Sequence, residues 1–362
     1  MTSPSVPSGV VAPALVVVVV ADSPVRARHL RQLLAGPGFV VAAQACSADE
    51  AHAAVVRTRP DVVLLDLHPE SEGIEAIERI MGARPTPIVL CGDAAEMASA
   101  GLAAGAVDVV GALDALPSSP QYVTALRRHL KVASRVRVIS HPRNRLTVGG
   151  VPSSGSRSGA DAELRLVVIG ASTGGPPALA MILGELPGDL PVPVLVVQHM
   201  AAGFVEGLAV WLDGLSRMPV VLAAEGQRLQ PGTVYVAPAG YNTVLRPGLR
   251  VTLETPPPGQ FHMPGVDAAF SSAAEVCRDR ALGVLLTGMG RDGAQGLQVL
   301  RSAGGPTIGQ DEPTSVVWGM PAVAQAMGAV QEELPLPKIA AAIVAAVRGK
   351  HGPAAGTATS PC

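Results

Sequence analysis

Aromatic residues are nearly missing from this chain of 362 residues: Phe, Trp and Tyr together make up 2% of it. This scarcity argues against an aromatic-rich binding face. Apolar residues still reach 48%, and they are mainly Ala, Val and Leu. A composition of small and branched aliphatic side chains favours parallel sheets that are packed by helices.

Charged residues are also few, at 15%, and the net charge is −2. Such a chain has no general electrostatic attraction to nucleic acid or to a membrane surface, so we expect neither as a partner. The longest apolar run, Val10–Ala21, is short and contains Pro13, and no basic residue precedes it. It therefore predicts neither a signal peptide nor insertion into a membrane.

Cysteines are rare and widely separated. The four are Cys46, Cys91, Cys277 and Cys362. Without close spacing they indicate isolated thiols, as expected in the cytosol, and no Cys/His cluster suggests a zinc site. The sequence thus predicts a cytoplasmic protein.

The strongest chemical signal is a strand–turn–helix pattern with a serine in the turn. The apolar, β-branched run Leu166–Gly170 has the length of a strand, Ser172 follows in a glycine-rich bend, and Pro176 and Pro177 open a helix. Such a turn holds a hydroxyl at the end of a parallel sheet, beside the N–H groups of a helix start. Taken alone, the same turn could also cap a helix or bind a phosphate.

A serine nucleophile needs a base to take its proton, and the sequence offers one. His199 ends a second buried-strand pattern, and Asp292 lies in a glycine-rich loop after a third. Open parallel sheets gather their active sites at such strand ends. The chain order Ser…His…Asp differs from the Ser…Asp/Glu…His order of α/β-hydrolases.

Five segments carry a specific resemblance, and they occur in one consistent order. They are Ile169–Gly175, Val197–Met200, Pro231–Pro238, Leu286–Ala294 and Gln310–Pro321. With them, residues 164–350 resemble the catalytic domain of the bacterial chemotaxis protein-glutamate methylesterases. The resemblance implies that Ser172 is the nucleophile, His199 the general base and Asp292 its orienting carboxylate. It also implies that Thr173 and Met289 lie around the reacting carbonyl, through backbone N–H groups.

The same resemblance implies a substrate. It implies hydrolysis of methyl esters on glutamate side chains in the cytoplasmic helices of methyl-accepting receptors, together with deamidation of receptor glutamines, and no cofactor for catalysis. Two positions depart from the family pattern, Asn242 in place of histidine and Gly265 of His262–Gly265 in place of serine. These departures can alter substrate contacts and leave the triad intact. Two alternatives stay open: an enzyme for another ester or amide, which would use the same triad, and a scaffold in a signalling system outside chemotaxis, which a degraded receiver would suit.

The first half of the chain alternates strands with helices, as in the flavodoxin-like fold. The predicted strands are 16–20, 39–45, 60–66, 87–91 and 106–110. Residues 14–130 resemble the receiver domain of response regulators, and Asp66 matches its phosphorylated aspartate. A receiver followed by a catalytic domain is the usual order in the methylesterase family, and it implies a histidine kinase as partner.

Phosphoryl transfer to a carboxylate needs a divalent cation held by nearby acids, a positive charge and a hydroxyl. The resemblance implies a Mg²⁺ ion at Asp22 and Asp66. However, Ala21, Gly92 and Ala112 stand where a second acid, the hydroxyl residue and a lysine are usual. Two interpretations stay open: a receiver that is still phosphorylated at Asp66, and a degenerate receiver that keeps its fold and docking surface.

Composition changes between and after these two regions. Residues 131–163 are basic and then rich in Gly and Ser, which predicts a flexible linker. Residues 351–362 predict a disordered tail. We therefore expect an α/β protein: a flavodoxin-like receiver domain at 14–130, followed by a doubly wound, mainly parallel-sheet catalytic domain at 164–350.

Overall fold

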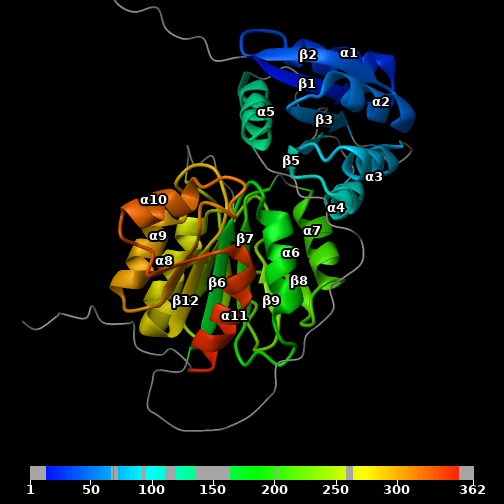
Figure 1. Ribbon diagram of the computed structural model, residues 1–362. Helices are drawn as coiled ribbons and strands as arrows, with labels where there is room; N and C mark the ends of the chain where they lie inside the picture. Colours follow the sequence, from blue (N-terminus) through cyan, green and yellow to red (C-terminus); the bar gives the residue numbers. More distant parts are fainter. Residues whose placement is uncertain are drawn as a thin grey trace, which may run out of the picture. The chain divides into compact units, whose positions relative to one another are not determined.

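Two mainly parallel sheets, one in each half of the chain, organise the computed structural model (Figure 1). The structure describes residues 14–66, 68, 72–91, 95–110, 120–135, 164–200, 203–257 and 264–349. Most of the predicted linker, the predicted tail, and Gly92, Ala112 and His262 lie outside the described residues. The chain divides into two compact units, which come mainly from its N-terminal and its C-terminal part.

The first sheet has five strands in the order β2-β1-β3-β4-β5. Its elements are β1 (Leu15–Val20), α1 (Pro24–Leu33), β2 (Phe39–Ala45), α2 (Ala48–Thr58), β3 (Val62–Asp66), α3 (Gly73–Ala83), β4 (Ile88–Cys91), α4 (Ala95–Ala104), β5 (Asp108–Val110) and α5 (Pro120–Ala133). β1 pairs in parallel with β2 and β3, and β3 with β4. The flavodoxin-like prediction is confirmed, and each expected strand is present within two residues of its expected bounds.

Buried strands and a capped helix place two acids at one end of this sheet. All five residues of β3 are buried, and Asp66 is the last of them. Ser23 caps α1 by accepting a hydrogen bond from Arg26 N, and Pro24 supplies the first helical position. Asp22 lies just before this cap and two residues after β1, the parallel neighbour of β3, which ends at Asp66.

The second sheet has seven strands in the order β14-β13-β12-β6-β7-β9-β8, and all its neighbouring strands run parallel. Its strands are β6 (Leu166–Ala171), β7 (Val194–Gln198), β8 (Val220–Leu222), β9 (Val234–Val236), β12 (Ala281–Leu285), β13 (Thr307–Gln310) and β14 (Glu332–Leu334). Strand β6 lies between β7 and β12, so the chain order reverses at β6. Ligands of open α/β sheets bind at such a switch point.

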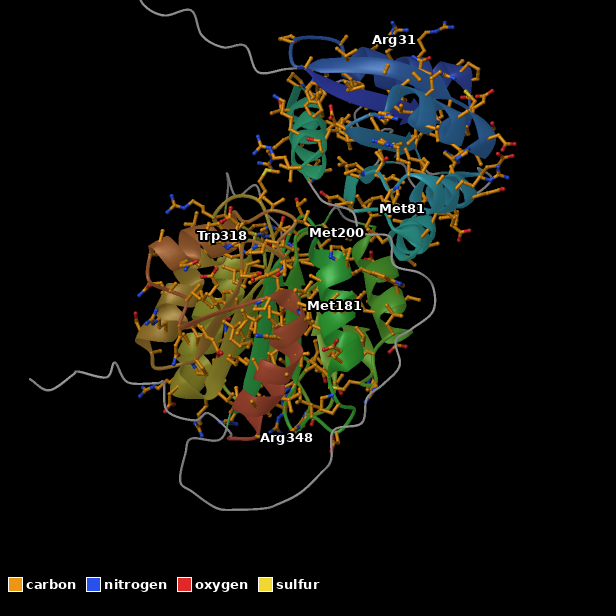
Figure 2. All side chains as sticks on the ribbon, in the orientation of Figure 1. Arg31, Met81, Met181, Met200, Trp318 and Arg348 are labelled. Carbon is orange, nitrogen blue, oxygen red and sulfur yellow. The ribbon has the colours of Figure 1, made fainter. Side chains whose placement is uncertain are left out.

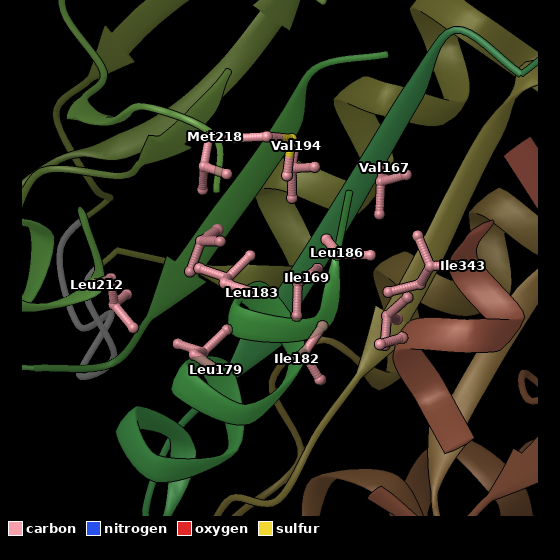
Figure 3. Packing of buried hydrophobic residues seen from close by; sticks show 14 of the residues in the cluster. Val167, Ile169, Leu179, Ile182, Leu183, Leu186, Val194, Leu212, Met218 and Ile343 are labelled. Carbon is pink, nitrogen blue, oxygen red and sulfur yellow. The ribbon is translucent and has the colours of Figure 1, made fainter. Parts of the chain in front are cut away.

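Helices cover both faces of this sheet, as expected for a doubly wound domain. One face carries α6 (Gly175–Glu185), α7 (Val205–Asp213) and α11 (Leu336–Val347), and the other α8 (Val266–Cys277), α9 (Ala294–Ser302) and α10 (Met320–Ala326). Alternate residues of β6 enter the two cores: Val167 and Ile169 pack with the first group of helices (Figure 3), Leu166 and Val168 with the second. Burial on both faces explains the continuous apolar run of this strand.

An antiparallel hairpin stands apart from the sheet. It consists of β10 (Asn242–Arg246) and β11 (Arg250–Glu254), and β10 contacts α8. A one-turn 3₁₀ helix, Arg278–Arg280, joins α8 to β12.

Met200 and Trp318 lie at the end of the C-terminal unit where the parallel strands finish (Figure 2). Among the described residues, no helix combines the length and the apolar character that a bilayer crossing requires.

Helix α7 offers a direct test of this packing. Val205 is fully buried, whereas Val210 on the same helix is 75% exposed. We expect Val205→Ala to lower the free energy of unfolding by about 2 kcal/mol, because two buried methyl groups are lost and a cavity remains. Val210→Ala should change it by less than about 0.5 kcal/mol.

Urea unfolding followed by tryptophan fluorescence measures this difference. Both tryptophans, Trp211 and Trp318, belong to the C-terminal unit, so the signal reports on that unit alone. Equal effects of the two substitutions would contradict the burial of this face of α7.

Candidate active site

Ser172 lies where β6 turns into α6. Its N–H donates to the carbonyl of Thr287 (3.0 Å), and its carbonyl accepts from Gly175 N (2.7 Å). Gly174 between them has a φ of 76°, and a Cβ there would lie 2.4 Å from the side chain of Val316. Only glycine fits this turn. The serine is 9% exposed and is held through its backbone on two sides.

A buried glutamine joins the serine turn to the histidine. Gln198, the last residue of β7, donates from its side-chain amide to the carbonyls of Ser172 and His199, both at 2.9 Å. The N–H of His199 donates to the carbonyl of Ala171 (3.0 Å). One amide thus fixes the ends of β6 and β7 relative to each other.

The imidazole of His199 faces the carboxylate of Asp292, with Nε2 2.7 Å from Oδ2. The two side chains are 8% and 15% exposed. The carboxylate also accepts three backbone N–H groups, from Val266 (2.8 Å), Asp267 (3.0 Å) and Gly293 (3.0 Å). Four donors on two oxygens leave Asp292 little freedom to turn away from the histidine.

Asp292 thereby caps helix α8 from a distant segment. Helix α8 follows Gly265, which has no side chain to serve as a cap. The first two N–H groups of the helix, from Val266 and Asp267, donate to the carboxylate of Asp292 instead. Burial alone would raise the pKa of Asp292. The hydrogen bond and charge of His199, with the amides of Asp267 and Val266, outweigh burial and lower that pKa to about 2. Asp292 is therefore ionised at neutral pH and can stabilise a protonated imidazole.

The loop after β12 lies against the serine. Thr287 Oγ1 donates to the carbonyl of Thr173 (3.0 Å). A Cβ on Gly288 would lie 2.7 Å from Ser172 Cβ. Glycine at this position therefore allows the loop after β12 to approach the turn that carries Ser172. Met289 follows directly and is partly buried. Thr173 and Met289 therefore both lie beside Ser172.

The segment before α10 supports this loop from the outside. Gln310 accepts from the N–H of Thr287 through Oε1 (2.8 Å). Gly288 donates to the carbonyl of Val317 (3.0 Å) and accepts from the N–H of Met320 (2.9 Å). These bonds fix the backbone of the loop that carries Met289 before any substrate arrives.

Asp267 is a second acid behind Asp292, and the sequence analysis missed it. It lies in the first turn of α8, and its Oδ1 accepts from Gly296 N in α9 at 2.6 Å. Burial raises the pKa of Asp267, the neighbouring Asp292 carboxylate raises it further, and the result is about 6. An acid in the first turn of a helix is too common to single out from sequence. Gln198, Thr287 and Gln310 were missed as site residues because only the fold reveals their contacts.

Known proteins match this chain over most of its length. Residues 167–343 match the CheB methylesterase family, and residues 17–111 match the response regulator receiver domain. The chain is 44% identical over 332 residues to protein-glutamate methylesterase/protein-glutamine glutaminase 2 of Anaeromyxobacter dehalogenans (strain 2CP-C), covering 90% of this chain and 95% of that protein. The chain belongs to the CheB methylesterase family.

The chain is also similar to a second curated relative and to a solved structure. Protein-glutamate methylesterase FrzG of Myxococcus xanthus is 40% identical over 297 residues, which cover 80% of this chain and 86% of that protein. The crystal structure of the Thermotoga maritima CheB methylesterase catalytic domain is 38% identical, covers 50% of this chain and 97% of its own, and gives a TM-score of 0.49. The family resemblance inferred from the motifs is confirmed by the family and sequence matches.

The two departures from the CheB pattern that were noted in the catalytic half form one contact. Gly265 N donates to Oδ1 of Asn242 (2.8 Å), and Asn242 is buried at the start of β10. Gly265 directly precedes Val266, whose N–H reaches Asp292. Both departures thus lie next to the start of α8. Neither of them is at Ser172 or His199.

In the receiver-like unit, Asp66 is bound by an arginine that the sequence analysis did not single out. Arg26 Nη2 donates to Asp66 Oδ1 (3.1 Å), and Nε donates to Oδ2. Arg26 Nε is also 3.9 Å from Oδ1 of Asp22. The structure therefore brings Asp22 and Asp66 together, with a guanidinium as their shared partner. In the part of the chain that the structure describes, no three His, Cys, Asp or Glu side chains are grouped to hold a metal ion.

The raised pKa of Asp267 predicts a pH-dependent effect of Asp267→Asn on stability. The folded state binds this proton more tightly than the unfolded state, whose pKa is 3.8, so wild-type stability falls as the pH rises from 3.8 to about 6. Asparagine cannot ionise and keeps an oxygen for Gly296. The unfolding free energy of the variant, relative to wild type, should therefore rise between these pH values and stay level above them.

Urea titrations at pH 4, 5, 6 and 7, followed by tryptophan fluorescence, measure this difference. Asp279→Asn, at an exposed aspartate of the same unit, is the matched control for the loss of one carboxylate. A flat difference for Asp267→Asn would show that Asp267 gains no proton on folding in this range.

Proposed function

We propose that this protein hydrolyses methyl esters of glutamate side chains on the cytoplasmic helices of methyl-accepting receptors, and deamidates receptor glutamines at the same site. The observation that carries the proposal is the contact between Asp292 and His199, on the segments that follow β12 and β7, the two strands that flank β6 and its following Ser172. The printed activities of the relatives, protein-glutamate methylesterase and protein-glutamine glutaminase, supply the substrate class.

In the proposed proton path, the Nε2–H of His199 donates to the carboxylate of Asp292, which lies 2.7 Å away, and Nδ1 takes the proton of Ser172. Ser172 Oγ then attacks the ester carbonyl carbon, and the carbonyl electron pair moves onto its oxygen. The backbone N–H groups of Thr173 and Met289 stabilise this oxyanion, an effect typically worth about 3–4 kcal/mol per donor.

Collapse of the tetrahedral intermediate breaks the bond to the methoxy oxygen. Protonated His199 gives its proton to that oxygen, methanol leaves, and the glutamyl group stays on Ser172. A water molecule, deprotonated by His199, then attacks the acyl-enzyme carbonyl; the bond to Ser172 Oγ breaks, His199 returns the proton to that oxygen, and the glutamate leaves. With a glutamine substrate the leaving group is ammonia, and the other steps are the same. Throughout, ionised Asp292 holds the ring in one tautomer and stabilises its charged form.

The proposal places the enzyme in the cytoplasm, in a chemotaxis-type signalling system with a histidine kinase as partner. All groups used in the two half-reactions belong to the chain or to water. The receiver-like unit supports the signalling context, because response regulator receiver domains serve such systems.

Asp292→Asn should lower kcat about 10⁴-fold, because the neutral amide neither fixes the Nε2–H tautomer nor stabilises the imidazolium. The amide oxygen can still accept an N–H from α8, so the protein should remain folded by circular dichroism. The exposed Asp279→Asn serves as control and should keep wild-type turnover. A loss smaller than tenfold for Asp292→Asn would remove Asp292 from the mechanism.

The decisive experiment measures methanol release from a methylated receptor cytoplasmic fragment. We expect release by the wild type and none by Ser172→Ala, with the two proteins equally folded. Release that persists in Ser172→Ala would refute the nucleophile assignment. Hydrolysis of a small ester without any receptor activity would favour another ester substrate. No hydrolysis of either substrate would favour the scaffold alternative.

A further inference from the structure

Asp66 is buried and both of its carboxylate oxygens are engaged. The side chain is 1% exposed at the end of β3. Arg26, from the first turn of α1, binds it through two nitrogens: Nε donates to Oδ2, and Nη2 to Oδ1 at 3.1 Å. This two-point pairing of a guanidinium with a carboxylate is the strongest ion-pair geometry available to side chains.

The same guanidinium also faces the second acid of the pocket. Arg26 Nε lies 3.9 Å from Oδ1 of Asp22, and the Asp22 side chain is 35% exposed. Glu72 is the other acid lining this cavity of about 190 Å³. Its Oε2 accepts the N–H of Ala48 at 2.8 Å and so helps to hold the start of α2.

These residues do not fit a divalent cation. Mg²⁺ requires a near-octahedral set of oxygens, usually with one or two carboxylates. Ala21 contributes no side-chain oxygen, and both oxygens of Asp66 already accept from Arg26. An incoming ion would have to share these two oxygens with Arg26 and would meet a fixed positive charge next to the acids.

We propose that Arg26 is the resident cation of this pocket: its guanidinium takes the place of the divalent metal ion and keeps Asp66 from accepting a phosphoryl group. A buried carboxylate needs a paired charge, and Arg26 supplies it permanently. An attacking oxygen must offer a lone pair to phosphorus, and two charge-assisted hydrogen bonds stabilise the carboxylate against that attack. The proposal concerns the N-terminal unit alone and holds whether or not the hydrolase proposal is correct.

Binding of Mn²⁺, a spectroscopic substitute for Mg²⁺, tests this on the full-length protein. Arg26→Met removes the positive charge and keeps a long apolar stem, and Arg28→Met is the matched control, because Arg28 is exposed on the same helix. By electron paramagnetic resonance we expect Arg26→Met to bind Mn²⁺ at least about tenfold more tightly than wild type, since one like charge has left a partly exposed site. Arg28→Met should match the wild type.

The double variant Arg26→Met/Asp66→Asn localises this site and should lose the gained affinity. Equal Mn²⁺ affinity in wild type and Arg26→Met, abolished in both by Asp66→Asn, would overturn the proposal. So would a gain in Arg26→Met that Asp66→Asn leaves unchanged, because the new ion would then bind elsewhere.

A second measurement uses the wild type and does not depend on the folding of Arg26→Met. The Arg26 Nε–H should give a slowly exchanging NMR signal that disappears in Asp66→Asn and that millimolar Mg²⁺ does not move. Incubation with radiolabelled acetyl phosphate and Mg²⁺ should leave Asp66 unlabelled. Loss of the Nε–H signal on adding Mg²⁺, or Mg²⁺-dependent labelling that Asp66→Asn abolishes, would refute the role of Arg26.

Discussion

The catalytic half depends on one carboxylate that serves the fold and the site at once. Asp292 accepts the first N–H groups of α8, which no side chain at Gly265 could accept, and its Oδ2 also binds Nε2 of His199. The helix start therefore stabilises the negative charge that the imidazole needs as its partner. Any displacement of α8 relative to β12 would move Asp292, and with it the imidazole of His199.

Hydrogen bonds from side chains to backbone carbonyls position the other segments of the site. Gln198 ties the carbonyls of Ser172 and His199 together, and Thr287 ties the loop after β12 to Thr173. These polar groups are buried, so each would be costly if it had no partner, and each therefore strongly favours one arrangement. Gly288 makes the arrangement possible, because any side chain there would collide with Ser172. The site is built by the fold before substrate binds.

The strands and the three candidate triad residues could be predicted from the sequence, because both follow a local sequence pattern. Strands buried on both faces are continuous apolar runs, so their ends are visible, and Ser172, His199 and Asp292 each follow such an end within seven residues. What could not be predicted are contacts across the chain that have no local pattern. Asp267 and Gln198 look like ordinary polar residues of a helix and a strand. Asn242 and Gly265 appeared as two separate departures, and only the fold shows that they form one hydrogen bond.

Asp66 and Asp292 show how the chemistry of the partner decides what a carboxylate can do. Asp66 ends the parallel strand β3, Asp292 lies in the loop after the parallel strand β12, and both are paired with a nitrogen-containing side chain. The partner of Asp292 is an imidazole, whose two ring nitrogens can donate and accept a proton, so that pair can take part in proton transfer. The partner of Asp66 is a guanidinium, which stays charged at any physiological pH. Two carboxylates that lie at or just beyond the ends of parallel strands are therefore suited to different roles: one can take part in proton transfer, and the other forms a permanent ion pair.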